Sequence, residues 1–256
     1  HFMLMMHNNH RYKYLFLGLL AALAVSYYNT LNNFKRALDP LAQTCAVPVQ
    51  GAPGNSAPIK LSIGGSDYLL EPLHSYEATA MVMGTSRNLI SSIRDIIPFD
   101  LGLCWGQTLC SGEFRKVEFS SMLNHFYAQW PSGVRVKLSD MANSHIVPGS
   151  PQVLAKLKKL VPGDQIRLKG VLVNVRKYPF GQAGRGRPER ELMSSTTRED
   201  KGDGACEIIY VASPYDVQLL SPGERLYPEI YRHCLWLLPA LLLVFVLHSH
   251  IPFMAQ

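Results

Sequence analysis

The sequence predicts a membrane-anchored α+β protein that is mainly β: a small OB-like or SH3-like barrel with short helices, flanked by N-terminal and C-terminal transmembrane helices. Three observations support this class. An alternating strand pattern begins at Gln165, directly after a Pro-Gly-Asp turn. Two long apolar segments lie near the two ends of the 256 residues. Charged residues make up 17% of the chain, below the roughly 25% of an average soluble protein.

The N-terminal segment, residues 1–36, is expected to be an anchor with a transmembrane helix over about residues 14–34. No formally charged residue occurs between Lys13 and Lys35, and about 20 residues is the length that a bilayer core requires. Aromatic residues lie at both ends of this stretch, where interfacial belts form. The alternative is a cleaved signal peptide, because alanine-rich sequence precedes Ser26.

Residues 37–58 are expected to form a linker, because four prolines lie among small and polar residues that bury little surface. Residues 59–220 then form the β-rich extramembrane domain. Its first part predicts short strands and one amphipathic helix that ends before Pro98. The strands are expected at residues 60–63, 68–70, 78–83 and 134–138, and the helix at 88–97.

The second part of this domain carries the strongest patterns. Ser150 is the expected N-cap of a helix whose first residue is Pro151. The strand at 165–175 follows, and a second strand at 205–211 returns after a loop in which Asp203-Gly204 supplies the positive φ that a tight turn needs. An arginine-rich stretch, residues 178–190, is expected to be an inserted loop.

Residues 221–256 predict a C-terminal hydrophobic helix, with a second span over about residues 234–253. No residue with a fixed charge follows Arg232; a half-inserted helix is the alternative. The net charge of +6 suits nucleic acid or an anionic membrane surface. The two apolar segments favour the membrane.

The five cysteines cannot all pair within one chain, and they include no CxxC pair. Cys104 and Cys110 are close enough in sequence to bridge across a loop, although each is more often a small buried hydrophobe. The common catalytic signatures (P-loop, GxGxxG, HExxH and GxSxG) are absent. The sequence therefore assigns no catalytic residue, no metal site and no cofactor.

The most suggestive pair is Cys206 with His145, since a cysteine beside a histidine makes a nucleophile or half a metal site. No further ligands occur at a recognisable metal spacing; His74 and His125 are interpreted as structural. The competing interpretation is that Asn143 and His145 fix a turn before Pro148 through side-chain to backbone hydrogen bonds.

Several short motifs recur in one order: Asp100 to Gly106, Asn143 to Pro148, Ser194 to Arg198 and Gly204 to Glu207. They resemble a group of uncharacterised bacterial proteins with an N-terminal anchor, a small β domain and motifs of the type LGWG, NxHxIP, SSxTR and GACE. Cys104 interrupts the first motif here. The resemblance covers about residues 68–211 and implies bacterial origin and domain limits, but no activity. Its candidate functional residues are Trp105, Asn143, His145, Arg198, Cys206 and Glu207.

From this architecture we expect a non-enzymatic accessory, assembly or structural subunit of a bacterial inner-membrane protein complex, with the β domain on the periplasmic side. The expected partners are the lipid bilayer and other subunits, not nucleic acid. Two alternatives remain: an OB-like module that binds nucleic acid or an anionic ligand, and a Cys/His-dependent enzyme. The candidate contact residues are Arg185, Arg187, Arg190, Trp236 and Phe245.

Overall fold

The computed structural model describes residues 2–30, 38–88, 93–122, 124–199 and 205–250, and for residues 2–11 and 245–250 it describes the backbone alone. The chain divides into two compact units. One is Lys35–Gly223, and the other combines His1–Phe34 with Glu224–Gln256. The mainly β character that the sequence predicts belongs to the first unit.

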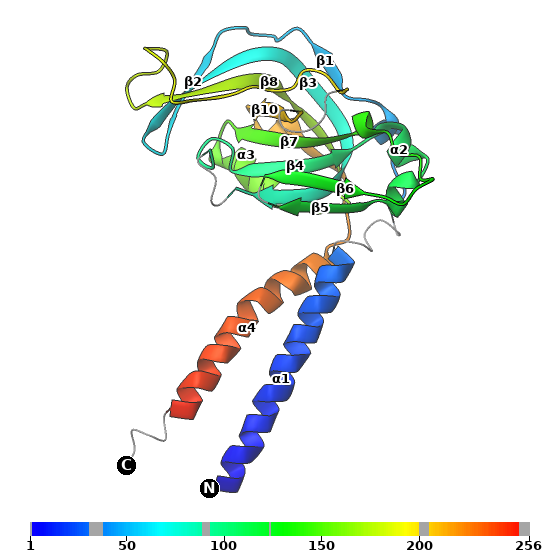
Figure 1. The fold of residues 1–256 in the computed structure, drawn as a ribbon, viewed down its shortest axis with the longest axis vertical. Coiled ribbons are helices and arrows are strands. Elements are labelled where there is room, and N and C mark those ends of the chain that lie inside the picture. Colours follow the sequence, from blue (N-terminus) through cyan, green and yellow to red (C-terminus); the bar gives the residue numbers. More distant parts are fainter. Residues whose placement is uncertain (1, 31–37, 89–92, 123, 200–204, 251–256) are drawn as a thin grey trace. The chain divides into compact units, whose positions relative to one another are not determined.

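Five strands of the unit Lys35–Gly223 close into a barrel (Figure 1). In order around the barrel they are β3 (Ser66–Arg87), β4 (Phe99–Cys104), β7 (Met141–Pro148), β10 (Glu207–Val211) and β8 (Gln165–Pro179), which pairs again with β3. β7 and β10 run parallel, and the other neighbours are antiparallel. With helix α3 (Pro151–Leu157) between β7 and β8, this is the five-stranded Greek-key arrangement of an OB fold.

The remaining elements extend or cover the barrel. β1 (Val49–Gly51) and β2 (Ile59–Ile63) pair with β3, whereas β9 (Arg190–Leu192) and β11 (Val217–Ser221) pair with β8. β5 (Glu118–Met122) and β6 (His125–Gln129) form a separate hairpin. The short helices are η2 (Ala42–Cys45), α2 (Gly106–Cys110), η3 (Glu113–Lys116), η4 (Leu138–Asp140) and η5 (Pro214–Asp216).

Side-chain alternation builds the barrel core. Leu101 and Leu103 of β4 and Ile146 of β7 point inward and are fully buried, as the period of two along a strand requires. Helix α3 closes one end with Val153 and Leu157, and the Ser150 hydroxyl accepts the backbone N–H of Val153, as expected of its N-cap. The opposite faces of β4 and β7 carry the polar residues Asp100, Asn143 and His145 beside Gly102, Cys104 and Val147.

Two local predictions differ from the structure. Residues 134–138 form no strand, because the backbone N–H of Lys137 donates to the hydroxyl of Thr108 at 2.9 Å instead of pairing with another strand. The stretch 143–148 is not a turn but most of strand β7. The helix predicted at 88–97 lies partly outside the described residues, since 89–92 are not among them; residues 93–96 form a turn.

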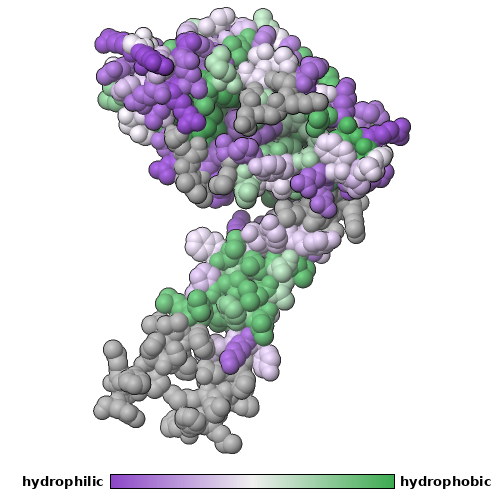
Figure 2. Space-filling view, viewed as in Figure 1, coloured by the Kyte–Doolittle hydropathy of each residue, from purple (hydrophilic) through white to green (hydrophobic). Residues whose placement is uncertain are grey.

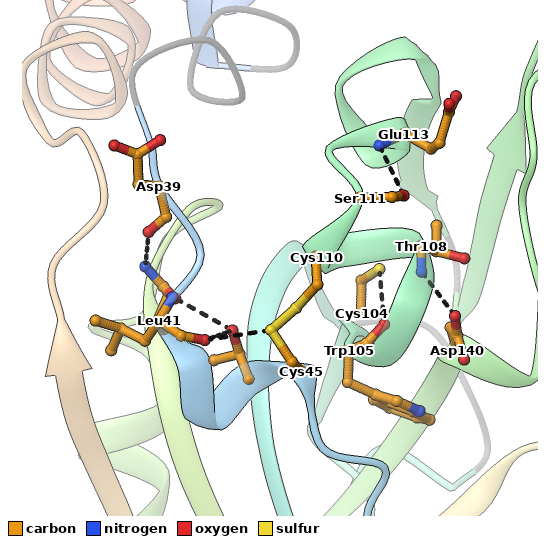
Figure 3. Close-up of a disulfide and its surroundings, with 12 residues drawn as sticks. Asp39, Leu41, Cys45, Cys104, Trp105, Thr108, Cys110, Ser111, Glu113 and Asp140 are labelled. Carbon is orange, nitrogen blue, oxygen red and sulfur yellow. Dashed lines mark hydrogen bonds between the residues drawn. A yellow bond between two sulfur atoms is a disulfide. The ribbon is translucent and has the colours of Figure 1, made fainter.

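The proline-rich stretch after residue 37 packs on the barrel and is not a free linker. A disulfide joins Cys45 of η2 to Cys110 of α2 (Figure 3), so Cys110 pairs with Cys45 and the buried Cys104 is a free thiol. The side chain of Gln165 accepts the Leu41 N–H at 2.7 Å and donates to the Asp39 carbonyl at 3.0 Å. These contacts fix the segment against the start of β8.

In the second unit, α1 (Phe2–Tyr28) and α4 (Leu226–His250) lie side by side, with the Tyr27 and Tyr231 ring centroids 5.5 Å apart (Figure 1). Figure 2 shows hydrophobic residues over both helices. Among the described residues, however, no helix combines the length and the apolar character needed to cross a membrane. The predicted transmembrane helices, the membrane-protein class and the inner-membrane location with a periplasmic β domain are therefore wrong.

A stretch without charge is not necessarily an apolar one. The apolar run of α1 begins only after Arg11 and Lys13, and the polar residues Asn29 and Thr30 follow directly after the helix. In α4 the first turns carry Glu229 and Arg232, and its last residues are histidine and serine. Polar residues thus shorten both runs below the span of about 20 apolar residues that a bilayer requires.

Candidate active site

Strand register places the candidate residues on one face of the barrel wall. Asp100 of β4 lies directly opposite His145 of β7, so their side chains share a face. On the other side of β7, Ile208 of β10 is level with His145. Cys206 comes two residues earlier and is therefore level with Asn143, on the same face. Three segments far apart in sequence thus bring an aspartate, a histidine and a cysteine onto one face, with Cys206 in the row next to that of Asp100 and His145.

The aspartate orients the histidine. The Nδ1 atom of His145 lies 2.8 Å from Oδ1 of Asp100, and this carboxylate is 1% exposed. The Asn88 amide donates to the same oxygen at 3.2 Å and to the Ile97 carbonyl at 2.8 Å. Because Asp100 occupies Nδ1, the other ring nitrogen of His145 is left for the Cys206 thiol.

The histidine is held as an imidazolium. Burial by itself disfavours the charged ring, but hydrogen bonds to Asp100 and Cys206, with the charges of both groups, outweigh it and raise the pKa of His145 to about 10. The ring therefore carries a positive charge beside the thiol at neutral pH. An adjacent His⁺ is an environment that favours the thiolate form of a cysteine, which is the nucleophile.

Cys206 differs from the other free cysteines in its access to solvent. It is half-buried and borders a cavity, whereas Cys104 and Cys234 are buried. Burial, with a smaller contribution from Asp140, raises the pKa of the Cys104 thiol. The amide Nδ2 of Asn143 lies 3.7 Å from the Cys206 sulfur and also donates to the Asn124 carbonyl at 2.7 Å. Cys206 is therefore the thiol that a substrate can reach.

The cavity beside Cys206 has a volume of about 410 Å³ and lies where β4 ends and β7 and β10 begin. Its walls combine aromatic and aliphatic side chains with a few polar ones, as in many small-molecule sites. The lining residues of the strands and the hairpin include Trp105, Phe126, Tyr127, Met141, Asn143 and Cys206. The segment before β10 adds Thr197 and Arg198, and Leu138 and Glu207 also border the cavity.

The β5–β6 hairpin covers the face that carries the row of polar residues. Its Phe126 ring packs where Gly102 has no side chain: a Cβ built on Gly102 would lie 2.3 Å from the ring. Phe126 also stacks on Phe119, with ring centroids 5.6 Å apart. OB folds bind ligands on their second and third strands, here β4 and β7. In this chain the hairpin turns part of that open face into a wall of the cavity.

We expect Gly102→Ala to lower the free energy of unfolding by about 1–3 kcal/mol, because the added methyl group cannot fit under Phe126 without moving the hairpin. Denaturant unfolding measures this difference. Gly54→Ala is the matched control, since a Cβ there meets no atom within 4 Å. Combining Gly102→Ala with Phe126→Leu should recover part of the loss. Equal stability of the Gly102→Ala variant and the parent would contradict this packing.

The structure brings together five of the six residues nominated from the sequence motifs around the cavity: Trp105, Asn143, Arg198, Cys206 and Glu207. The sixth, His145, does not line the cavity but forms a hydrogen bond with Cys206, which does. The nominated contact residues lie elsewhere. Arg185, Arg187 and Arg190 belong to the segment that joins β8 to β9 or to the start of β9, Trp236 is exposed on α4, and the side chain of Phe245 is outside the described residues.

Sequence reasoning missed Asp100 as a functional residue. The signal was present, because Asp100 is the one charged residue in the apolar run Phe99-Asp100-Leu101-Gly102-Leu103-Cys104, every residue of which is buried. A buried carboxylate in such a strand needs a charged or hydrogen-bonding partner. The sequence alone did not identify His145 as that partner, because the pairing depends on strand register.

Within the described parts of the chain, no group of three or more His, Cys, Asp or Glu side chains is arranged to hold a metal ion. The site is thus described by its protein groups: a free thiol, an imidazolium, a buried carboxylate and a neighbouring cavity. The family resemblance inferred from the motifs stays a prediction. No family model, no curated protein and no solved structure matches this chain.

Proposed function

We propose that this protein is a thiol-dependent acyl-transfer enzyme, in which Cys206 is the nucleophile, His145 its acid-base partner and Asp100 the residue that orients His145. The observation that supports this most is the contact series from Asp100 to His145, with Nδ1 and Oδ1 2.8 Å apart, and from His145 to Cys206 at the wall of a cavity. A nucleophile, a base and a group that orients the base form the usual catalytic arrangement for acyl transfer.

In the proposed first step, the Cys206 thiolate attacks the carbonyl carbon of an ester, thioester or amide. A carbon–sulfur bond forms, the bond to the leaving group breaks, and the leaving group takes the proton of the His145 imidazolium. In the second step, neutral His145 accepts a proton from water, and the hydroxide attacks the acyl group. The carbon–sulfur bond breaks, which releases the carboxylic product and restores the thiolate and the imidazolium.

The site also offers a donor for the oxyanion that forms in each step. One N–H of the Asn143 amide donates to the Asn124 carbonyl, and the other donates to the Cys206 sulfur at 3.7 Å. Once the sulfur has attacked, this second N–H can donate to the oxygen of the acyl group instead. A carbonyl oxygen bonded to the attacked carbon would lie close to this amide, which is where an oxyanion donor acts. Asn143 therefore has the position of an oxyanion donor.

The test uses p-nitrophenyl acetate as a small acyl donor. We expect a burst of about one equivalent of p-nitrophenolate per chain, and an acetyl group on the peptide that contains Cys206, detected by mass spectrometry. Cys206→Ser should abolish both signals. Cys234→Ala is the matched control, because it removes a free thiol of the other unit and should keep the burst. Acetylation of cysteines in proportion to their exposure alone would overturn the proposal.

A second proposed function is docking on a partner protein, the role expected from the overall architecture. Large apolar side chains on the surface of α1 and α4 favour it, among them Leu15, Leu17 and Trp236, which is 76% exposed. Size-exclusion chromatography of the chain purified from its own cells tests this role. Elution with one partner in fixed stoichiometry supports docking, whereas elution as a lone chain argues against it.

A further inference from the structure

Arg198 is the cationic residue of the cavity wall, and it is fixed in place before any ligand binds. Its Cζ atom lies 5.4 Å from the centroid of the Trp105 ring and 5.9 Å from that of the Tyr76 ring, and its Nη2 donates to the Pro48 carbonyl at 2.9 Å. Stacking on aromatic rings and a bond to a neutral carbonyl position the guanidinium but leave its charge in place.

No carboxylate among the described residues forms an ion pair with Arg198. Glu199 accepts the backbone N–H of Arg198 and does not border the cavity. Glu207 also borders the cavity, and both its carboxylate and the Arg198 guanidinium influence the pKa of Tyr76. Glu207 is 3% exposed whereas Arg198 is partly exposed, so the charge that a ligand can reach is positive.

Backbone contacts keep Arg198 close to the thiol. The Ser195 N–H donates to the Cys206 carbonyl at 3.0 Å, and the Ile208 N–H donates to the Ser194 hydroxyl at 2.9 Å. The segment that carries Arg198 therefore runs beside the start of β10, and both Arg198 and Cys206 border the same cavity. A ligand in this cavity can meet the guanidinium with one group while another group lies at the thiol.

We propose that the cavity selects acyl compounds that carry an anionic group, a carboxylate or a phosphate, which Arg198 binds while the scissile carbonyl lies at Cys206. The part of this inference that concerns the scissile carbonyl rests on the proposed function. The anion preference is tested separately, by alkylation of the Cys206 thiol, which involves no acyl transfer. A guanidinium with its planar fork is the side chain best suited to both oxyanions.

The experiment compares two alkylating agents that differ in charge, iodoacetate and iodoacetamide, on the intact chain at low salt. Mass spectrometry of the Cys206 peptide gives each rate, and glutathione gives the ratio for a free thiol. We expect the ratio of the iodoacetate rate to the iodoacetamide rate to be about fivefold higher at Cys206 than for glutathione. Added sodium chloride should reduce this excess, since salt screens the attraction.

Arg198→Gln should lower the ratio about fivefold, although the charge of His145 remains, while changing the iodoacetamide rate by less than about twofold. Arg187→Gln, in the segment between β8 and β9, is the matched control and should keep the excess. Sodium acetate and sodium phosphate at equal ionic strength, added separately as protectants against iodoacetamide, distinguish a carboxylate site from a phosphate site. Protection by one of them assigns the anion.

A ratio equal to that of glutathione in the parent chain, or an excess that Arg198→Gln keeps, would overturn the anion preference. The salt dependence in the parent chain decides the question if the variant does not fold. The two proposals fail separately. Acetylation of Cys206 without the iodoacetate preference removes only the anion site, and the preference without acetylation removes only the acyl-transfer function.

Discussion

Replacing His145 by glutamine will lower the rate at which iodoacetamide alkylates Cys206 at pH 7 by about 30-fold. The imidazolium beside the sulfur stabilises the negative charge with which the sulfur attacks. Removing a hydrogen bond from a charged donor costs about 2 kcal/mol, which corresponds to about that factor in rate. Alkylation kinetics followed by mass spectrometry of the Cys206 peptide measure the change.

The dependence of this rate on pH gives a second readout. Hydrogen bonds and charges from Asp100 and Cys206 outweigh burial and raise the pKa of His145 to about 10, so its positive charge is present at every pH below that value. We therefore expect the parent to be alkylated faster than the His145→Gln variant at every pH up to about 9. Above about pH 10, where the ring loses its proton, the difference between the two rates should disappear.

Two further variants separate the role of His145 from a general loss of structure. Asp100→Asn removes the carboxylate that supports the imidazolium and should give a pH profile between those of the parent and His145→Gln. His125→Gln, at an exposed position of β6, should leave the profile unchanged. If the parent and the His145→Gln variant are alkylated at the same rate at neutral pH, the imidazolium does not act on Cys206 and the proposed mechanism is wrong.

Local patterns in the sequence predicted the strands well where both chemistry and periodicity agreed. The alternation from Gln165 onward and the turn before it gave the start of β8, and the Ser150-Pro151 pair gave the start of α3. At 134–138 the same alternation failed. A strand exists only if its backbone pairs, and the backbone of Lys137 bonds to Thr108 instead.

The sequence named most residues of the candidate site but not the contacts that they make with one another. Cys206 and His145 were a visible pair, yet they are 61 positions apart by their numbers and meet only because β10 runs parallel to β7. The pairing of Asp100 with His145 likewise depends on the register of β4 against β7. Such long-range register is not encoded in any one segment, so the sequence could suggest the residues but not how they lie together on one face of the barrel.

The spacing of the cysteines in the sequence did not predict the Cys45–Cys110 disulfide. It favoured a disulfide between the near neighbours Cys104 and Cys110. In β4 the side chain of Cys104 lies on the buried surface of the strand, whereas Cys110 ends α2 and meets η2 (Figure 3). Gly106 has a positive φ, and this conformation turns the chain away from β4. Only glycine fits here, because a Cβ would also clash with the side chain of Asp140. The disulfide partner of Cys110 is therefore decided by the direction that the chain takes after Trp105, and not by proximity in sequence.

Replacing both Cys45 and Cys110 by alanine is expected to lower the free energy of unfolding by about 4 kcal/mol. The disulfide closes a loop with a sequence separation of 65 residues, and the chain entropy that such a loop removes from the unfolded state corresponds to about that energy. Denaturant unfolding of the parent and the double variant measures the difference. Reduction of the parent with dithiothreitol should reproduce the loss, while the double variant should not respond to the reductant.

The same disulfide should also control the anion preference at the cavity. Cys45 lies three residues before Pro48, whose carbonyl holds Arg198, and Cys110 ends the short helix that follows Trp105, on whose ring the guanidinium rests. Without the disulfide both supports of Arg198 loosen, so the iodoacetate excess should fall. The iodoacetamide rate should stay within about twofold, because Asp100, His145 and Cys206 belong to β4, β7 and the start of β10. A double variant that loses less than about 1 kcal/mol of stability and keeps the full iodoacetate excess would show that other contacts, such as those of Gln165, hold the segment around Cys45 without the disulfide.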